Sequence, residues 1–303
     1  MNSLDDKVIL VTGSGRGFGR SMAYSYAKRG ASVVAVALEE DELTDMSEEI
    51  SRIGGDTFTI TVDLANEEEI FLVRDLILEK YNRLDAIINN AAVCPWKRFS
   101  ETTLQDWDMI FAVNLRSPFI LCKAFFETFK KQGKGSIINI TSRSAEIGFL
   151  AEVAFGPTKW GIEGLTQCLA LELQPYNIAV NTLRVATPPG MQLKPTGMTL
   201  EEVRNMPIEI RKKYADNESM AIAFGEAWAF LALQDAHGIT GQRLGSRELA
   251  EFLKSNSWEA AKANWRRKLT KAVYVSYDFP KSARYQIPDG GTEEHKFSFK
   301  NED

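Results

Sequence analysis

The stretch Val8-Ile9-Leu10-Val11-Thr12-Gly13-Ser14-Gly15-Arg16-Gly17-Phe18-Gly19 runs from an apolar, β-branched segment directly into a glycine cluster. The apolar segment predicts a buried strand, and the periodic apolar residues that follow predict a helix. Glycines between a first strand and a first helix let the backbone approach a pyrophosphate, to which the helix N-terminus offers free N–H donors. We therefore predict a dinucleotide-binding unit whose cofactor contacts include Gly13, Ser14, Arg16, Gly17, Phe18 and Gly19.

From residue 7 to about 245, short apolar runs alternate with longer amphipathic stretches. The predicted buried strands are Val8–Thr12, Ser32–Ala37, Thr57–Val62, Ala86–Asn89, Ser136–Thr141 and Ile178–Leu183. Parallel neighbouring strands need a crossover helix, so this alternation predicts a parallel sheet covered on both faces. The expected fold class is α/β, a doubly wound parallel sheet of the Rossmann type.

Two regions depart from the alternation, and they set the expected domains. Residues 187–225 contain a capping box from Thr199 to Glu202. We expect a lid insertion here, beyond the carboxyl ends of the strands, where such sheets bind ligands. Residues 251–303 mix aromatic, basic and acidic side chains. We expect residues 1–250 to form the catalytic domain and 251–303 a C-terminal extension that packs on this domain or on a partner subunit.

Composition excludes several classes of protein. The 303-residue chain carries a net charge of −5, which gives no global attraction to nucleic acid or to an anionic membrane. No apolar run approaches the ~18–20 residues of a membrane-spanning helix. Three scattered cysteines and two histidines offer no metal-ligand spacing. We expect a cytoplasmic protein with no metal, no membrane and no nucleic-acid partner.

Further motifs follow in order along residues 7–245. They are Thr12-Gly13-x-x-x-Gly17-x-Gly19, Asp63-Leu64, Asn89-Asn90-Ala91, Asn114, Ser142, Lys159 and Ile239-Thr240-Gly241-Gln242. Together they resemble the short-chain dehydrogenase/reductase family. The resemblance implies an NAD(P)-dependent oxidoreductase that interconverts a secondary alcohol and a ketone, acting on a small-molecule substrate. It also implies cofactor contacts at Asp63, Leu64, Asn89, Asn90, Ala91 and Lys159.

The resemblance assigns catalytic roles, and one position departs from them. In the family a Ser orients the substrate oxygen, a Lys lowers the pKa of a catalytic Tyr, and an Asn kinks a helix and holds a relay water. Ser142, Lys159 and Asn114 match these three positions, but the Tyr position is Phe155. Loss of a positioned general acid or base costs roughly 10²–10⁴ in rate. We expect the chain as written to be nearly inactive in hydride transfer.

Three interpretations of Phe155 stay open. It can be an engineered Tyr→Phe replacement in an ordinary dehydrogenase, because the other catalytic positions are intact. It can belong to a natural enzyme with another proton carrier, including a lyase or isomerase, for which Glu146 and Glu152 in the same loop are candidates. It can also mark a non-redox member that binds a dinucleotide or other ligand as a sensor or scaffold.

The end of the second strand bears on the choice between NAD and NADP. Ala37 or Leu38 falls where the fold commonly places an acid for the ribose hydroxyls or an Arg for a 2′-phosphate. The acidic run 39–41 would repel a 2′-phosphate, whereas Arg16 would attract it. The balance favours NAD.

Other departures concern the substrate pocket. Ala92 replaces the last Gly of the family's Asn-Asn-Ala-Gly segment, and Val185-Ala186 replaces Pro-Gly beside the nicotinamide. Four basic residues of the neighbouring loops are either surface cations or a site for an anionic group on the substrate. They are Lys97, Arg98, Arg143 and Arg184.

The resemblance also implies a homodimer or homotetramer, assembled through helices near 104–130 and 153–171. Several apolar residues on these helices suit either such an interface or the core of the domain itself. They are Phe125, Phe126, Phe129, Leu165, Leu169 and Leu173.

Overall fold

The computed structural model describes residues 4–193, 205, 207, 210, 213–265, 282–286 and 292–296. A seven-stranded parallel sheet forms the centre, in the order β3-β2-β1-β4-β5-β6-β7. Its strands are β1 Val8–Thr12, β2 Ser32–Ala37, β3 Asp56–Thr61, β4 Ala86–Asn89, β5 Gly135–Thr141, β6 Ile178–Arg184 and β7 Arg243–Gly245. The predicted doubly wound α/β class is confirmed.

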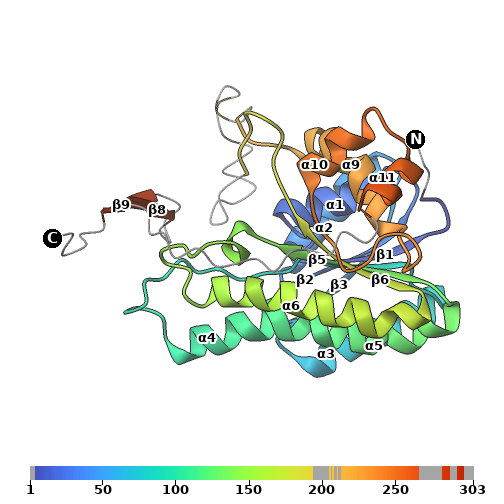
Figure 1. Cartoon of the computed structure of the whole chain (residues 1–303), viewed down its shortest axis with the longest axis horizontal. Coiled ribbons are helices and arrows are strands. Elements are labelled where there is room, and N and C mark those ends of the chain that lie inside the picture. The colour runs from blue at the N-terminus through green and yellow to red at the C-terminus, as the bar shows by residue number, and fades with distance from the viewer. Residues whose placement is uncertain are drawn as a thin grey trace.

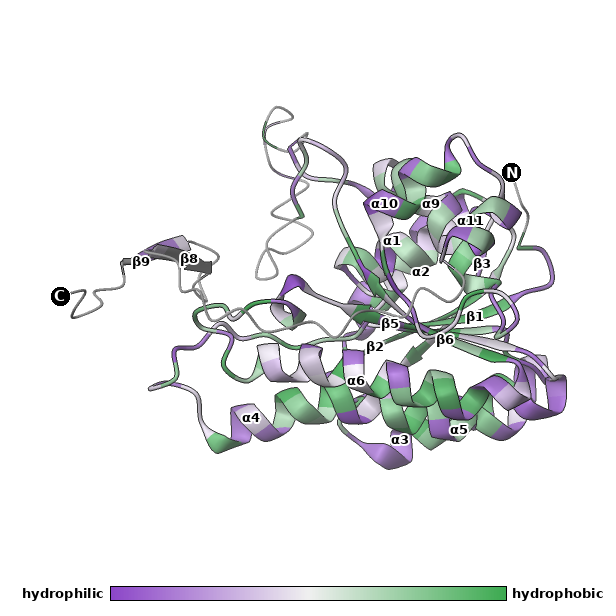
Figure 2. Ribbon diagram, in the orientation of Figure 1, coloured by the Kyte–Doolittle hydropathy of each residue, from purple (hydrophilic) through white to green (hydrophobic). Residues whose placement is uncertain are grey.

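Helices cover both faces of the sheet (Figure 1). One layer contains α1 Gly17–Ala27, α2 Glu40–Arg52, α9 Asn217–Ala232, α10 Ser246–Leu253 and α11 Trp258–Trp265. The other contains α3 Glu67–Tyr81, α4 Leu104–Phe111, α5 Ser117–Gln132 and α6 Phe155–Leu173. Apolar residues concentrate on the strands and on the helix faces turned toward them (Figure 2). Each face therefore has its own apolar core, which holds the carboxyl ends of the strands in fixed register.

Helices α4 and α5 contribute to one of these cores. Phe125 and Phe129 are fully buried against the sheet, so they serve the core and not an intersubunit surface. Among the described residues, Leu104–Gln132 is the one helical run long and apolar enough to span a membrane by length and composition. The expectation that no apolar run approaches this length is therefore wrong. Packing explains the composition, because 56% of the apolar window is buried inside the domain.

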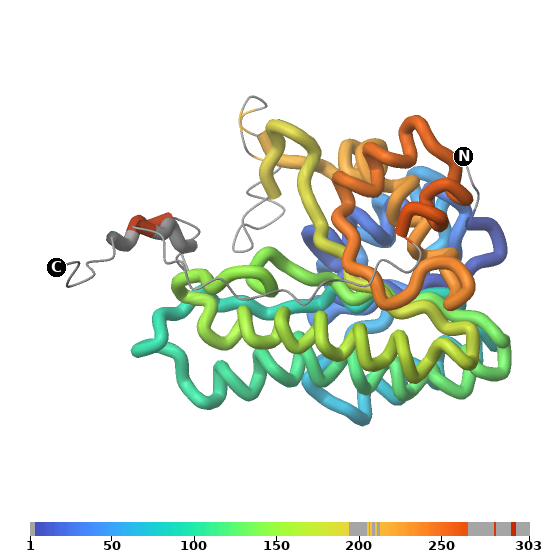
Figure 3. The backbone as a smooth tube through the Cα atoms, in the orientation of Figure 1, coloured from blue at the N-terminus to red at the C-terminus, as the bar shows by residue number. Residues whose placement is uncertain are grey.

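The region expected to form a lid includes the beginning of a core helix. α9 starts at Asn217, and Met220 and Phe224 are buried in the same core as α1. α1 and α9 lie side by side although they are far apart in sequence (Figure 3). The predicted capping box from Thr199 to Glu202 falls outside the described residues.

The first part of the C-terminal extension packs on the domain. Trp258 in α11 donates its indole N–H to Glu226 at 2.7 Å and meets the ring of Phe230 edge to face. Farther along, β8 Ser282–Gln286 pairs with β9 Thr292–Lys296 in an antiparallel hairpin. The part of the extension nearest the domain thus completes the α9 layer.

Candidate active site

The turn from β1 to α1 is too tight for any residue but glycine at position 19. A Cβ on Gly19 would lie 2.1 Å from the carbonyl oxygen of Gly13, which itself has a φ of 63°. Asn90 holds the turn from the end of β4, because its amide donates to the carbonyl oxygens of Thr12 at 2.9 Å and Gly13 at 3.1 Å. The backbone of Ala91 adds a hydrogen bond to the Thr12 hydroxyl at 3.0 Å. The predicted glycine loop and the Asn90–Ala91 segment therefore form one rigid unit.

The N-terminus of α1 is suited to bind an anion. Arg16 precedes the helix without a side-chain cap, and the first turn contains no acid. A Cβ built on Gly17 would meet nothing within 4 Å, so the backbone here faces open space. Uncapped N–H groups at such a helix end fit a pyrophosphate. Ser14, just before α1, is buried. Its backbone N–H and its hydroxyl both donate to the carbonyl oxygen of Val36.

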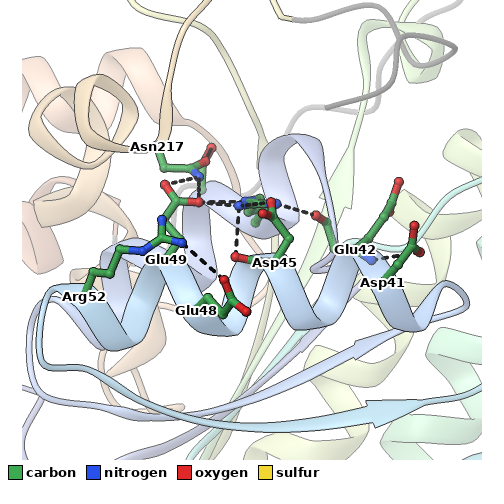
Figure 4. Close-up of polar contacts among 10 residues, drawn as sticks. Asp41, Glu42, Asp45, Glu48, Glu49, Arg52 and Asn217 are labelled. Atoms are coloured by element: carbon green, nitrogen blue, oxygen red, sulfur yellow. Dashed lines mark hydrogen bonds and ion pairs between the residues drawn. The ribbon is translucent and has the colours of Figure 1, made fainter. Parts of the chain in front are cut away.

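Acidic side chains surround the end of β2 and the start of α2. Arg16 lies 3.3 Å from the carboxylate of Glu42. Farther along α2, Asp45 and Glu49 both pair with the buried Arg20, and Asn217 donates to Glu49 at 2.9 Å (Figure 4). These contacts join α1, α2 and the start of α9. The negative charge therefore extends from the sheet edge along the exposed face of α2.

Three more predicted cofactor residues take different positions. Asp63 follows β3, where its carboxylate accepts from the backbone N–H of Ala65 at 2.8 Å, and Leu64 is buried beside it. Asn89 is buried within the sheet layer and donates to Asn139 at 2.7 Å. Its amide nitrogen is therefore engaged inside the fold, whereas Asn90 reaches the glycine turn.

A π-helical turn, Ala112–Arg116, joins α4 to α5. Asn114 lies within it, and its buried amide exchanges hydrogen bonds of 2.7 and 2.9 Å with the backbone of Val93. The same amide lies 3.3 Å from the hydroxyl of Thr158, which donates to the carbonyl of Phe155 at 2.6 Å. Such turns often occur at functional sites. Asn114 thereby connects the loop after β4 with the first turn of α6.

Phe155 and Lys159 lie one helical turn apart at the start of α6. The Lys159 ammonium is 5.3 Å from the centroid of the Phe155 ring and donates to the carbonyl of Ile140 at 2.9 Å. Burial lowers the pKa of Lys159 to about 8. The lysine thus sits against a ring that has no hydroxyl to titrate.

Ser142, at the end of β5, begins a short chain of hydrogen bonds. Its hydroxyl lies 3.1 Å from that of Ser144, which donates to the carboxylate of Glu152 at 2.5 Å. Burial raises the pKa of Glu152, and hydrogen bonds from the side chains of Ser144 and Trp96 oppose that rise. Glu152 was a candidate in the sequence analysis, whereas Ser144 was missed. The spacing of two serines, Ser142 and Ser144, at the end of β5 is the signal that could have identified it.

Glu146, the other candidate acid, has quite different surroundings. Its carboxylate lies 2.5 Å from Arg243 and 3.6 Å from Arg184. Arg243 also contacts Glu163 at 3.2 Å and donates to the carbonyl of Ser142 at 3.3 Å. Glu146 therefore belongs to an ion-pair network that supports the strand ends.

Two of the four basic residues considered for an anionic substrate group are engaged in ion pairs. Lys97 pairs with Asp106 at 2.8 Å, and this contact lowers the pKa of Asp106 to about 2. Arg184 is paired with Glu146, while Arg143 is exposed. Ion pairing thus occupies two of these cations, which favours their interpretation as structural and surface charges.

A family model described as short chain dehydrogenase matches residues 7–202. The chain belongs to the short-chain dehydrogenase family. It is 34% identical over 242 residues to an uncharacterized oxidoreductase of Thermotoga maritima, with 78% of this chain and 93% of that protein covered. It is also 34% identical to cyclopentanol dehydrogenase of Comamonas sp. (strain NCIMB 9872), with 64% of this chain and 78% of that protein covered.

Solved structures of short-chain dehydrogenases share the fold. A metagenomic short-chain oxidoreductase in complex with NADP superposes with a TM-score of 0.66 at 25% identity, covering 80% of this chain and 98% of that one. A putative NAD(P)-dependent gluconate 5-dehydrogenase from Beutenbergia cavernae, with bound NADP, gives 0.66 at 27% identity, covering 84% and 99%. The short-chain dehydrogenase assignment thus rests on sequence and on structure.

Proposed function

We propose that this short-chain dehydrogenase binds a nicotinamide dinucleotide and exchanges hydride with a small secondary alcohol or ketone. The bound dinucleotide would supply or accept the hydride. The tight turn at Gly13 and Gly19 and the uncapped N-terminus of α1 fit its pyrophosphate. Lys159 and Asn90 border the same edge of the sheet. Relatives named cyclopentanol dehydrogenase and D-threitol dehydrogenase support an alcohol of small size.

One observation carries this proposal. Lys159 is buried and held 2.9 Å from the Ile140 carbonyl, next to the ring at the family's Tyr position. Burying an ammonium is costly, and an apolar residue would pack at this position without that cost. A charge kept here beside Ser142 and Asn114 fits a site still arranged for proton and hydride transfer. Phe155 then lowers the rate roughly 10²–10⁴-fold relative to a tyrosine enzyme, without removing the site.

The variant Phe155→Tyr tests this function. With a carbonyl panel that includes cyclic ketones and a reduced dinucleotide, we expect turnover to rise about 10²-fold or more, because a general acid is restored beside Lys159. Phe149→Tyr adds a phenol elsewhere in the same loop and should leave the rate unchanged. Dinucleotide binding without turnover in Phe155→Tyr would instead favour a sensor or scaffold, and no binding at all would refute a redox role.

We infer a preference for NAD over NADP. Leu38 is exposed at the end of β2, and a hollow along the start of α2 is lined mainly by carboxylates, which repel a 2′-phosphate. The lining residues are Glu39, Glu40, Asp41, Thr44, Asp45 and Glu48. A fluorescence titration with NADH and with NADPH measures the preference directly, and tighter binding of NADPH would contradict it.

We also propose that the subunits form a homodimer or homotetramer through α4, α5 and α6. Leu104, Phe119 and Leu171 are large apolar residues exposed on these helices, and an interface would cover them. Light scattering at several protein concentrations distinguishes such an assembly from a monomer.

A further inference from the structure

We propose that Ser142, Ser144 and Glu152 form a proton relay that carries the substrate proton in place of the hydroxyl missing from Phe155. This inference rests on the proposed hydride-transfer function and names the residues that complete it. Ser142 would touch the substrate oxygen. Glu152 would act only through the two serines, as the far end of the relay.

The three side chains are in continuous hydrogen-bond contact. The Ser142 and Ser144 hydroxyls are 3.1 Å apart, and Ser144 donates to Glu152 at 2.5 Å. The backbone N–H of Ser144 also donates to the Ser142 hydroxyl at 3.1 Å, which fixes that oxygen in place. Each hydroxyl can donate one hydrogen bond and accept two, so a proton can move along the chain by successive exchange.

The direction of the hydrogen bonds depends on the charge of Glu152. When Glu152 is ionised it only accepts, so Ser144 donates to it and Ser142 donates to Ser144. Ser142 then offers a lone pair to a substrate hydroxyl. When Glu152 is protonated, every donor reverses, and the Ser142 hydrogen is free to bond a carbonyl oxygen. The ionised relay therefore suits alcohol oxidation, and the protonated relay suits ketone reduction.

The proton balance closes in both directions. In ketone reduction the carbonyl carbon receives hydride from the reduced dinucleotide, and its oxygen takes the Ser142 proton. Ser142 is reprotonated by Ser144, Ser144 by Glu152, and the resulting carboxylate by solvent. In alcohol oxidation the same protons move in reverse, and Glu152 receives the proton as the C–H hydride departs to the oxidised dinucleotide.

The backbone on both sides of the bridge that positions Glu152 is strained. Trp96 and Ala151 both adopt left-handed conformations, with φ of 49° and 61°. The residues that follow them, Lys97 and Glu152, pair in an isolated parallel bridge between the two loops. Strained residues of this kind concentrate at functional sites. The bridge to Lys97 and the hydrogen bond from Ser144 thus hold Glu152 next to the serines.

The groups facing Glu152 favour a proton carrier over a permanent ion pair. Trp96 and Ser144 hydrogen-bond its carboxylate, and the Cys94 thiol lies close enough for its pKa to rise to about 12 under burial and the charge of Glu152. The ammonium of Lys97, on the bridged loop, is directed to Asp106. Burial raises the pKa of Glu152 above its ordinary value. Glu146, by contrast, is neutralised by two arginines.

A double-mutant cycle tests the relay. In the wild-type chain, Glu152→Gln should lower residual ketone reduction about tenfold or more, while in the Phe155→Tyr background it should cost less than about threefold, because the tyrosine then supplies the proton. Reduction by the wild type should also decline as pH rises through the pKa of Glu152, and Glu152→Gln should remove that inflection. Glu146→Gln is the matched control and should keep it.

Each other outcome of the cycle counts against the relay. Equal losses in both backgrounds would mean that Glu152 only supports the loop. A wild type with no turnover beside an active Phe155→Tyr would overturn the relay and leave the proposed function standing. Inactivity of every variant would refute the function itself.

A second measurement needs no turnover. Infrared titration of the chain without cofactor should show a protonated carboxyl band that persists above the ordinary range for glutamate and is lost in Glu152→Gln. Ser144→Ala should shift the midpoint of that band upward, because the ionised carboxylate loses a hydrogen-bond donor. Absence of any such band would overturn the proposal.

Discussion

The β1–α1 turn and the loop from Ser142 to Phe155 lie at the same edge of the sheet but work differently. The turn acts through backbone groups, held by a close approach that only glycine permits at position 19. The loop acts through side chains whose charge depends on burial and on partners from other elements. The turn is therefore recognisable from spacing alone. The loop requires knowledge of which side chains meet.

We expect the largest effect on stability from a substitution that disrupts the turn between β1 and α1. Gly19→Ala places a methyl group 2.1 Å from the Gly13 carbonyl oxygen and 2.4 Å from the Asn90 amide, neither of which can move without opening the turn. We expect the free energy of unfolding to fall by about 3 kcal/mol. Urea denaturation followed by circular dichroism measures this change.

The matched control is a glycine whose Cβ position is open. Gly164 lies within α6, and a Cβ there would meet nothing within 4 Å. Gly164→Ala should stabilise the chain by about 0.5–1 kcal/mol, because alanine loses less conformational entropy in a helix. Similar effects for the two substitutions would show that the turn is not tight.

The next largest effect is the pH dependence of stability that arises from Lys159, the charged residue beside Phe155. Burial lowers the pKa of Lys159 from 10.5 to about 8. Below pH 8 the lysine is charged in both the folded and the unfolded chain. The full cost of burying the ammonium then lowers the free energy of unfolding. Between pH 8 and pH 10.5 only the unfolded chain still binds the proton, so the free energy of unfolding rises with pH. The whole rise is roughly 3 kcal/mol.

Lys159→Met removes this dependence while keeping an apolar side chain of similar length. The difference in the free energy of unfolding between wild type and variant should therefore change across the interval from pH 8 to pH 10.5, in favour of the wild type at the higher pH. Urea unfolding at a series of pH values provides the measurement. A constant difference would mean that Lys159 is as well solvated when folded as when unfolded.

The sheet was predictable because its strands are short apolar runs with helical crossovers between them. Even the brief β7 follows directly after the predicted segment that ends at Gln242. The end of the lid was not predictable, because residues from Asn217 onward are apolar for packing on α1, a contact with an element far away in sequence. Local patterns do not reveal which distant face a helix will cover.

The residues of the candidate site also differ in whether the sequence alone could identify them. Ser142, Asn114 and Lys159 were placed by motif, and Asn114 indeed occupies a distorted helical turn. Sequence alone could not separate Glu146 from Glu152, since both lie in one loop. The difference comes from Arg243, which arrives from β7 and pairs with Glu146. Titration behaviour depends on such contacts and so appears only in the folded chain.

The smallest effect concerns the choice of dinucleotide at the end of the turn. Glu42 lies 3.3 Å from Arg16 across an exposed ion pair, so removing its charge would free the arginine and reduce repulsion of a 2′-phosphate. Glu42→Gln should strengthen NADPH binding relative to NADH by about threefold to fivefold, in line with the small energies of exposed pairs. Fluorescence titration with both dinucleotides gives the ratio. Glu48 also lines the hollow, but its loss breaks an exposed pair with Arg52 and leaves Arg16 bound to Glu42, so Glu48→Gln should change the ratio less. If both variants shift the ratio equally, the discrimination arises from the total charge of α2 and not from Arg16.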